Sequence, residues 1–313
     1  MIQHLKKSIQ RHPFTWFYVT SVLIEILVMM VLFLTDGEAK LVAVLERSGR
    51  PLKTDYVSTL QLVFAEPSIL PVMLLLVLQP LTPTIAAFTI TAIAFKQQGM
   101  KHLLGRYRFW SDEVGWQSGW KVWVLCLTTF VGMSLATAGL NRWLLSSNNF
   151  SWNINILSTS FLFSLLIAMF LDGGGVTEET GWRGFALPFL QQRMSPLSAT
   201  LLLGILWSLW HIPAKPDLLT SGFAYFLLFF GVFTIRLTAL SVVMTYFYNR
   251  VGGSTLIAIA MHGLHNDSVG LMGSPLSESD RTFLITEITL LIPILVSACI
   301  FLVISKGRLG KNT

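Results

Sequence analysis

Long uninterrupted runs of apolar residues limit most strongly what this chain can fold into. Several runs reach the roughly 20 residues that a helix needs to cross a bilayer. In lipid a spanning segment must satisfy its own backbone hydrogen bonds, so such runs form helices. Only 12% of the 313 residues are charged, whereas soluble domains carry about 25%. The chain is therefore expected to be all-α, a polytopic transmembrane helical bundle.

About eight spans are expected from these runs. The segments 156–171 and 176–192 form either two short spans or one broken helix, and the count of eight follows the second alternative. With eight spans both termini lie on one side, which the basic ends make cytoplasmic. The spans lie near residues 15–35, 68–95, 119–144, 156–192, 197–212, 222–248, 253–271 and 282–305.

The net charge of +6 does not point to nucleic acid. Lys and Arg are expected to flank the spans on the cytoplasmic side and to touch anionic lipid headgroups. Membrane lipids are therefore expected partners, and nucleic acid is not. The two cysteines, Cys126 and Cys299, lie inside apolar runs and are interpreted as small core residues. The short loops favour a bacterial inner membrane.

Two adjacent carboxylates, Glu178 and Glu179, interrupt this apolar chain. A carboxylate in or near the hydrocarbon costs several kcal/mol unless it is paired or hydrated. A structural interpretation is available. The glycines 173–175 would break the chain, Thr177 would act as N-cap, and the glutamates would occupy the first turn of a helix. A functional interpretation needs further polar groups at the same depth.

Helix geometry separates the two glutamates. Glu179 and Arg183 are four residues apart, in the order that suits an ion pair on one helix face. Glu178 projects roughly 100° away and has no such partner on its own helix. Glu179 is therefore interpreted as structural, and Glu178 is left for chemistry.

His211 ends the apolar run 201–210, where a histidine is often only an interfacial or capping group. The depth of His211 along its helix favours a further role. Glu178 precedes Arg193 by 15 residues and His211 follows Pro196 by 15 residues. At about 1.5 Å per residue, both lie about 22 Å from the turn between them. An ion pair or a shared water between Glu178 and His211 is therefore feasible.

A third polar element lies in the apolar run 253–271. His262 and Asn266 share a helix face, and His265 is a near neighbour. The alternative is a polar contact between membrane helices, for which Asn and His are often used. Two other charges fall inside apolar runs: Arg236, as a partner for a buried carboxylate or a lipid-facing side chain, and Glu25, for which no role is assigned.

These three elements, in this order, resemble the CAAX-protease and bacteriocin-processing (CPBP, also called Abi) family of intramembrane proteases. The resemblance covers about residues 160–270, and its second motif has Trp207 where the family often has Phe. The motifs are Glu178-Glu179-Thr180-Gly181-Trp182-Arg183, Trp207-Ser208-Leu209-Trp210-His211 and His262-Gly263-Leu264-His265-Asn266.

The resemblance implies an intramembrane endopeptidase that acts on membrane-associated proteins or peptides. It implies that Glu178 and His211 activate a water, and that His262 and Asn266 stabilise the oxyanion. It divides the chain into helices with an interfacial segment at 1–155, a catalytic core at 156–275, and a last helix with a basic tail at 276–313. The alternatives are a bacteriocin self-immunity protein or membrane scaffold, and a proton- or ion-coupled transporter.

Metal dependence is left open by the resemblance, because metalloprotease is one of the family's labels. If a metal takes part, Glu178, His211 and His262 would hold Zn²⁺ with a water as fourth ligand. The contiguous HExxH motif of soluble zinc proteases does not occur in this sequence. The expectation is therefore a glutamate-driven hydrolysis without a metal.

Overall fold

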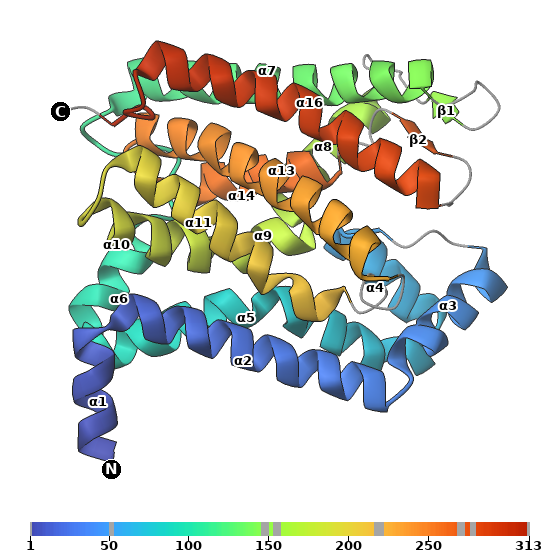
Figure 1. Cartoon of the computed structure of the whole chain (residues 1–313), viewed down its shortest axis with the longest axis horizontal. Coiled ribbons are helices and arrows are strands. Elements are labelled where there is room, and N and C mark those ends of the chain that lie inside the picture. The colour runs from blue at the N-terminus through green and yellow to red at the C-terminus, as the bar shows by residue number, and fades with distance from the viewer. Residues whose placement is uncertain are drawn as a thin grey trace.

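Helices that run side by side make up almost all of the computed structural model (Figure 1). The structure describes residues 2–49, 53–144, 150–152, 158–215, 222–267, 273–275 and 280–311. The N-terminal helices are α1 (Ile2–Arg11), α2 (Pro13–Leu34), α3 (Gly37–Ser48), α4 (Tyr56–Ala65), η1 (Pro67–Ile69), α5 (Leu70–Ala94), α6 (Lys96–Leu104) and α7 (Gly115–Leu144).

The helices of the C-terminal half include those that carry the three motifs. They are α8 (Thr159–Leu171), α9 (Gly173–Glu179), the π-helical segment η3 (Thr180–Ala186), α10 (Leu187–Gln191), α11 (Pro196–Trp210), η4 (Ile212–Ala214), α13 (Phe223–Arg250), α14 (Thr255–Asn266) and α16 (Asp280–Ser305). Two three-residue strands, β1 (Phe150–Trp152) and β2 (Gly273–Pro275), pair in antiparallel fashion. The expected all-α bundle is confirmed.

Six helices in the described part of the chain are long and apolar enough to cross a membrane. The protein is thus a multi-pass integral membrane protein. About eight spans were expected; α14 has only 12 residues, and the helical run from α9 to α10 is divided by η3. The six are Pro13–Leu34, Pro67–Ala94, Gly115–Leu144, Pro196–Ala214, Phe223–Arg250 and Leu284–Ser305.

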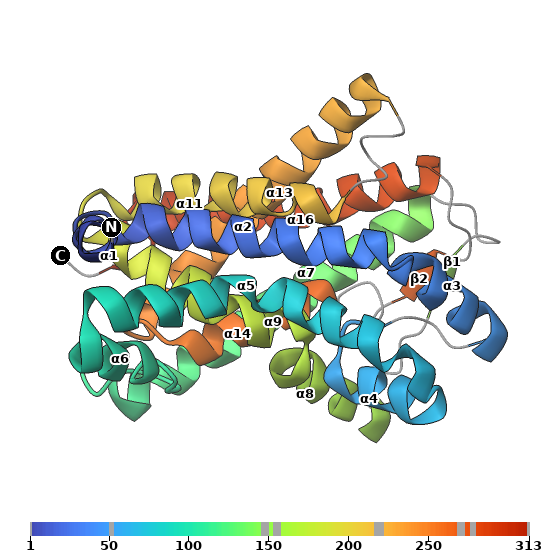
Figure 2. The ribbon, with the colours of Figure 1, turned by 90° about the horizontal axis from the view of Figure 1, so that it is seen from below.

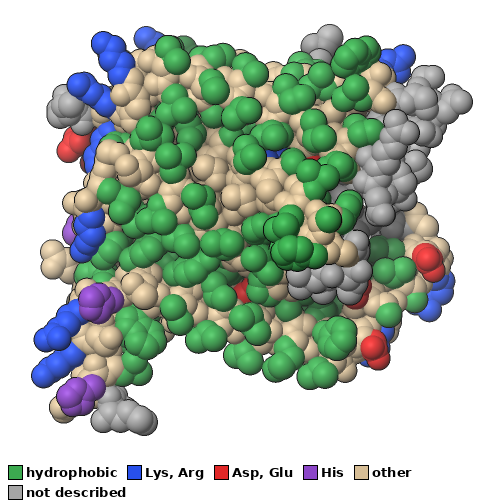
Figure 3. Space-filling model, viewed as in Figure 1, with side chains coloured by type: hydrophobic (Ala, Val, Ile, Leu, Met, Phe, Trp, Pro, Cys, Tyr) green, Lys and Arg blue, Asp and Glu red, His purple; other side chains and the backbone are tan. Residues whose placement is uncertain are grey.

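Both chain ends lie at the same end of the bundle, as Figures 1 and 2 agree. Hydrophobic side chains cover the flank of the molecule that Figure 3 shows. Exposed apolar side chains of the bundle include Leu23 and Phe33 of α2 and Leu227 of α13. Lys and Arg gather at the end with the termini, whereas acidic and basic side chains both appear at the opposite end. We call the end with the termini the basic end.

Close helix crossings depend on glycine. A Cβ on Gly204 of α11 would lie 2.6 Å from the Cα of Thr238 of α13, and one on Gly181 of η3 would lie 2.5 Å from Pro83 of α5. Lipid-embedded helices gain little from the hydrophobic effect and associate through such close van der Waals packing. Three buried indoles, of Trp182, Trp207 and Trp210, fill the centre between these helices.

Candidate active site

The helix that carries the two glutamates begins at Gly173. Asp172 has an extended backbone (φ −63°, ψ 133°), and its Oδ1 accepts a hydrogen bond of 2.6 Å from the Gly175 amide, as an N-cap does. The expectation that the glycines break the chain and that Thr177 caps the helix was wrong. The break lies at Asp172, and Thr177 lies inside the helix, where its hydroxyl donates to the carbonyl of Gly173.

The glycines serve close packing instead of breaking the helix. A Cβ on Gly173 would lie 2.7 Å from the carbonyl oxygen of Thr54, and one on Gly175 would lie 2.7 Å from the carbonyl oxygen of Ile259. Larger residues would push α9 away from α14. The run of glycines therefore brings the glutamates against the helix that carries His262 and Asn266.

Glu179 and Arg183 form the ion pair that their spacing predicts. Arg183 Nη1 lies 2.8 Å from Glu179 Oε1, and both side chains are fully buried. Arg183 also donates to Ser241 Oγ of α13 at 3.0 Å, and its guanidinium stacks on the Trp207 ring at 4.3 Å. The pair therefore ties α9 and η3 to α13 and α11.

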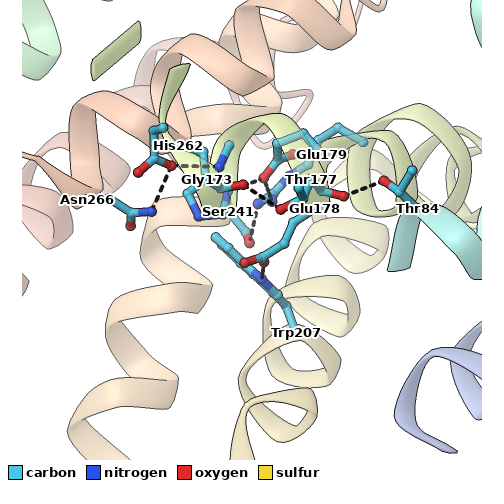
Figure 4. A network of polar contacts seen from close by, with 12 residues as sticks. Thr84, Gly173, Thr177, Glu178, Glu179, Trp207, Ser241, His262 and Asn266 are labelled. Carbon is cyan, nitrogen blue, oxygen red and sulfur yellow. Dashed lines mark hydrogen bonds and ion pairs between the residues drawn. The ribbon is translucent and has the colours of Figure 1, made fainter. Parts of the chain in front are cut away.

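Glu178 points in a different direction and is held by Trp207. The indole Nε1 donates to Glu178 Oε2 at 2.8 Å, as Figure 4 shows, and the glutamate is 4% exposed. The sequence reasoning did not identify this partner. The signal in the sequence was Trp207, one helical turn before His211. The motif more often has Phe at this position, and Phe has no hydrogen-bond donor.

His211 lies one turn beyond Trp207. Its Nδ1 is 2.8 Å from the Trp207 carbonyl oxygen, and its ring contacts Trp210 and Phe233 edge-on. Within the described residues no direct hydrogen bond joins Glu178 and His211. The depth estimate used the α-helical rise, but η3 lies between Glu178 and the turn. Because a π-helix bonds i to i+5, the α-helical spacing does not hold there.

His262 has its two ring nitrogens in different surroundings. Nδ1 lies 2.7 Å from Glu179 Oε1, so this carboxylate fixes the orientation of the ring. The ring also meets the face of Trp207 edge-on at 5.2 Å. Glu179 thus serves both Arg183 and His262, a double role that the spacing along one helix could not predict.

Three polar atoms converge above Gly174. A Cβ on Gly174 would lie 2.9 Å from Asn266 Nδ2, 3.0 Å from His262 Nε2 and 3.3 Å from Glu178 Oε1. Because Gly174 has no side chain, one carboxylate oxygen and two nitrogens border a narrow space beside its backbone, which a methyl group would overfill. The structure therefore brings Glu178, His262 and Asn266 together from α9 and α14, while His211 contacts Trp207, the partner of Glu178.

Asn266 is oriented by the residue that caps α9. Its Nδ2 donates to Asp172 Oδ1 at 3.0 Å. Asp172 also forms a β-bridge with Asp55, at the place where α4 and α8 lie side by side in Figure 2. Just past α14, burial and the charges of Asp172 and Asp55 raise the pKa of Asp267 to about 7. Its negative charge is therefore lost as the pH falls through neutrality.

The other charged side chains inside the apolar runs lie outside the group of Glu178, His262 and Asn266. Arg236 pairs with Glu287 of α16 at 2.9 Å, so the interpretation as a partner of a buried carboxylate is confirmed. His265 joins that pair instead of the site, with Nε2 2.6 Å from Arg236 Nη1. Glu25 of α2 is fully buried, and the side chain of Gln79 donates to it at 2.7 Å.

The structure does not arrange Glu178, His211 and His262 as a set of metal ligands. In the described ranges, no three His, Cys, Asp or Glu side chains are arranged so that they could hold a metal ion. One oxygen of Glu178 is bonded to Trp207, and one nitrogen of His262 is bonded to Glu179. The chemistry proposed below therefore has no step through a metal.

Comparisons with known proteins find relatives of this region. Residues 158–267 match the family model described as type II CAAX prenyl endopeptidase Rce1-like. The CAAX prenyl protease 2 of Methanococcus maripaludis is 32% identical over 127 residues, which are 38% of this chain and 42% of that relative. The similarity thus spans less than half of either protein. It supports a CPBP/CAAX protease family for the region that contains all four candidate catalytic residues.

Proposed function

We propose that this CAAX-protease-like membrane protein is an intramembrane endopeptidase that hydrolyses peptide bonds of membrane-associated proteins or peptides. The observation that carries the proposal is the convergence of Glu178 Oε1, His262 Nε2 and Asn266 Nδ2 above Gly174. A base and two donors that converge on one point are what the hydrolysis of an amide requires.

Glu178 acts as the general base. Trp207 holds Oε2, and Oε1 borders the narrow space beside Gly174 together with His262 Nε2 and Asn266 Nδ2. A water placed there gives its proton to Oε1 as its oxygen attacks the scissile carbonyl carbon. When the tetrahedral intermediate collapses, the C–N bond breaks and the proton passes from Glu178 to the leaving amine. The products are a new carboxylate and a new amine.

His262 and Asn266 stabilise the oxyanion of that intermediate. Asn266 uses one N–H for Asp172 and has a second for the substrate. His262 donates from Nε2 when it carries both ring protons, with Nδ1 held by Glu179. Donors fixed in advance cost no reorganisation during the reaction, and removing one such donor typically costs about 10²–10³-fold in kcat.

His211 assists from the next turn of α11. Its Nδ1 is engaged by a backbone carbonyl, so its remaining nitrogen is the one that can share a water with Glu178. Glu179 and Arg183 are the architectural members of the site, because their fully buried ion pair also contacts His262 of α14 and Trp207 of α11.

The substrate is proposed to be a protein or peptide held at the membrane. The relative's name refers to prenyl proteins, so a prenylated C-terminal peptide is one class to be tested beside unmodified membrane peptides. The basic end would face the cytoplasm and place the N-terminus there, in a bacterial inner membrane, because Lys and Arg favour cytoplasmic loops.

Hydrolysis in ¹⁸O-water tests the proposal directly. Purified protein in liposomes should cleave a membrane-anchored peptide from a panel of prenylated and unmodified substrates. Because water supplies the new carboxylate oxygen, mass spectrometry should find one ¹⁸O at each new C-terminus and none in the amine product. A protein that cleaves no member of the panel, or products without ¹⁸O, would contradict the proposed hydrolysis.

A chelator should leave the cleavage rate unchanged. No described group of side chains is arranged to hold a metal, and the proposed steps run through Glu178, His262 and Asn266 alone. The measurement is the rate before and after dialysis against a zinc chelator, with the metal content determined by mass spectrometry. Loss of activity that added Zn²⁺ restores would overturn the metal-independent mechanism and leave Glu178, His211 and His262 as the proposed ligands.

A further inference from the structure

A polar cleft at the basic end lies apart from the active site. Its volume is about 580 Å³, and none of its residues belongs to the group around Gly174. It lies where α13 ends, before α14 begins, and beside the C-terminal segment. Its walls include Arg106, Ser111, Tyr248, Arg250, Gly252 and Lys311.

Cations dominate the wall of this cleft. Arg106, Arg250 and Lys311 line it, and Glu113 is the one acidic side chain among the described residues of its lining. Lys311 Nζ donates to the carbonyl oxygen of Gln191, which holds the ammonium group at the wall. Three cations against one carboxylate make the cleft a place for an anion.

A glycine turn allows a guanidinium to lie against the backbone. Gly252 and Gly253 have φ values of 74° and 82°, which side-chain-bearing residues rarely adopt. A Cβ on Gly253 would lie 2.9 Å from Arg106 Nη1. Arg106 makes one side-chain hydrogen bond to the described residues, to the Tyr248 hydroxyl at 3.0 Å. The rest of its planar fork of donors is left for a ligand.

Two buried donors in the same wall have no partner. The hydroxyl oxygen of Ser111, a residue that is only 5% exposed, is buried without a hydrogen bond, and so is the side-chain nitrogen of the half-buried Gln191. Buried polar atoms have a hydrogen-bond partner in the great majority of cases, and a bound ion or water is one explanation of an exception. A hydroxyl and an amide nitrogen beside three cations match the oxygens of a phosphate.

We propose that this cleft binds a phosphate group, supplied by an anionic lipid headgroup or by a soluble phosphate. The location favours the lipid, because clefts of basic residues at the ends of membrane helices bind anionic headgroups. Binding there would join the ends of α13 and α10 to the C-terminal segment. This site is independent of the proposed proteolysis, and nothing in its test needs a peptide substrate.

The test compares two double variants that remove the same charge. Arg250→Gln with Lys311→Gln removes two cations from the cleft, and Lys101→Gln with Arg308→Gln removes two exposed cations that do not line it. Binding of phosphatidylglycerol to purified protein in detergent is measured by native mass spectrometry. Each Lys or Arg contributes about 5-fold, so the cleft variant should lose about 30-fold and the control variant less than about 3-fold. Equal losses would show general surface attraction and overturn the proposal.

Two further arms identify the source of the phosphate and the role of Ser111. Ser111→Ala removes one buried donor and should weaken binding by about 10-fold. Inorganic phosphate should compete with phosphatidylglycerol only if the cleft recognises the phosphate itself. Thermal stabilisation by phosphatidylglycerol and not by phosphate alone identifies a lipid site, and the reverse identifies a soluble ligand. No stabilisation by either, with Ser111→Ala unchanged, would refute the site.

Discussion

Replacing Glu178 with Gln is expected to abolish peptide cleavage, with a rate loss of about 10³-fold or more, because a general base contributes about 10²–10⁴-fold. Gln has the same shape and can still accept the hydrogen bond that Trp207 donates to Glu178. It cannot take a proton from water. The folded bundle should therefore persist, and the measurement is the single-turnover rate of cleavage at equal amounts of folded protein.

Glu25→Gln is the matched control for this loss. Glu25 is also a fully buried carboxylate of the bundle, near enough to Glu178 for their charges to interact, but it is bonded to Gln79 and does not border the space above Gly174. Its loss of rate should stay below about 10-fold. Comparable losses in the two variants would assign the effect to buried charge in general. Full activity of Glu178→Gln would remove Glu178 from the mechanism.

The transporter alternative makes a different prediction for the same variant. If Glu178 belonged to an ion relay, proteoliposomes of the native protein would show ion flux, and the Gln variant would lose it. On the proposed function, native liposomes show cleavage without flux. Flux that disappears with Glu178→Gln, in protein that cleaves nothing, would favour the relay.

Gly174→Ala is expected to reduce cleavage by about 100-fold without changing any catalytic side chain. The added methyl would lie 2.9–3.3 Å from the ends of Asn266, His262 and Glu178, closer than nearly all real contacts. These ends must move by a few tenths of an ångström, and a displacement of about 1 Å can cost about 10²-fold in rate. The displaced groups would also no longer hold the water between them in the proposed position.

Gly139→Ala separates this local effect from a general effect of the substitution. Gly139 lies in α7, also inside a helix, and a Cβ there would meet nothing within 4 Å. Ala favours a helix over Gly by about 1 kcal/mol at both positions, so neither variant should unfold. Cleavage by Gly139→Ala should equal that of the native protein. A Gly174→Ala variant with native activity would show that the space above Gly174 is not used.

The class of fold could be predicted from the sequence because it depends on composition along short windows. Runs of apolar residues force helices in lipid, and each of the six spanning helices overlaps one of the predicted segments, with bounds that differ by a few residues. The boundaries near Gly173 could not be predicted. Glycine is typical both of a chain break and of close packing, and only the backbones of Thr54 and Ile259 decide in favour of packing.

The contact of the candidate site that lies within one helix could also be predicted. The Glu179–Arg183 pair follows from a separation of four residues on one helix, which sets the contact whatever surrounds it. The hydrogen bond from Trp207 to Glu178 joins two helices, so it depends on how each is rotated. The π-helical segment η3 changes that rotation and depth, and no pattern in the sequence predicted a π-helix there.

The sequence by itself determined that the chain is a membrane bundle and which few polar residues merit attention, since both follow from hydrophobicity and from spacing within single helices. Only the tertiary structure decided how those residues are shared: Trp207 holds Glu178, Glu179 serves both Arg183 and His262, and Gly174 leaves the space where three side chains meet. The physical reason is that contacts between helices depend on their rotation and closeness, which glycine packing across the bundle sets.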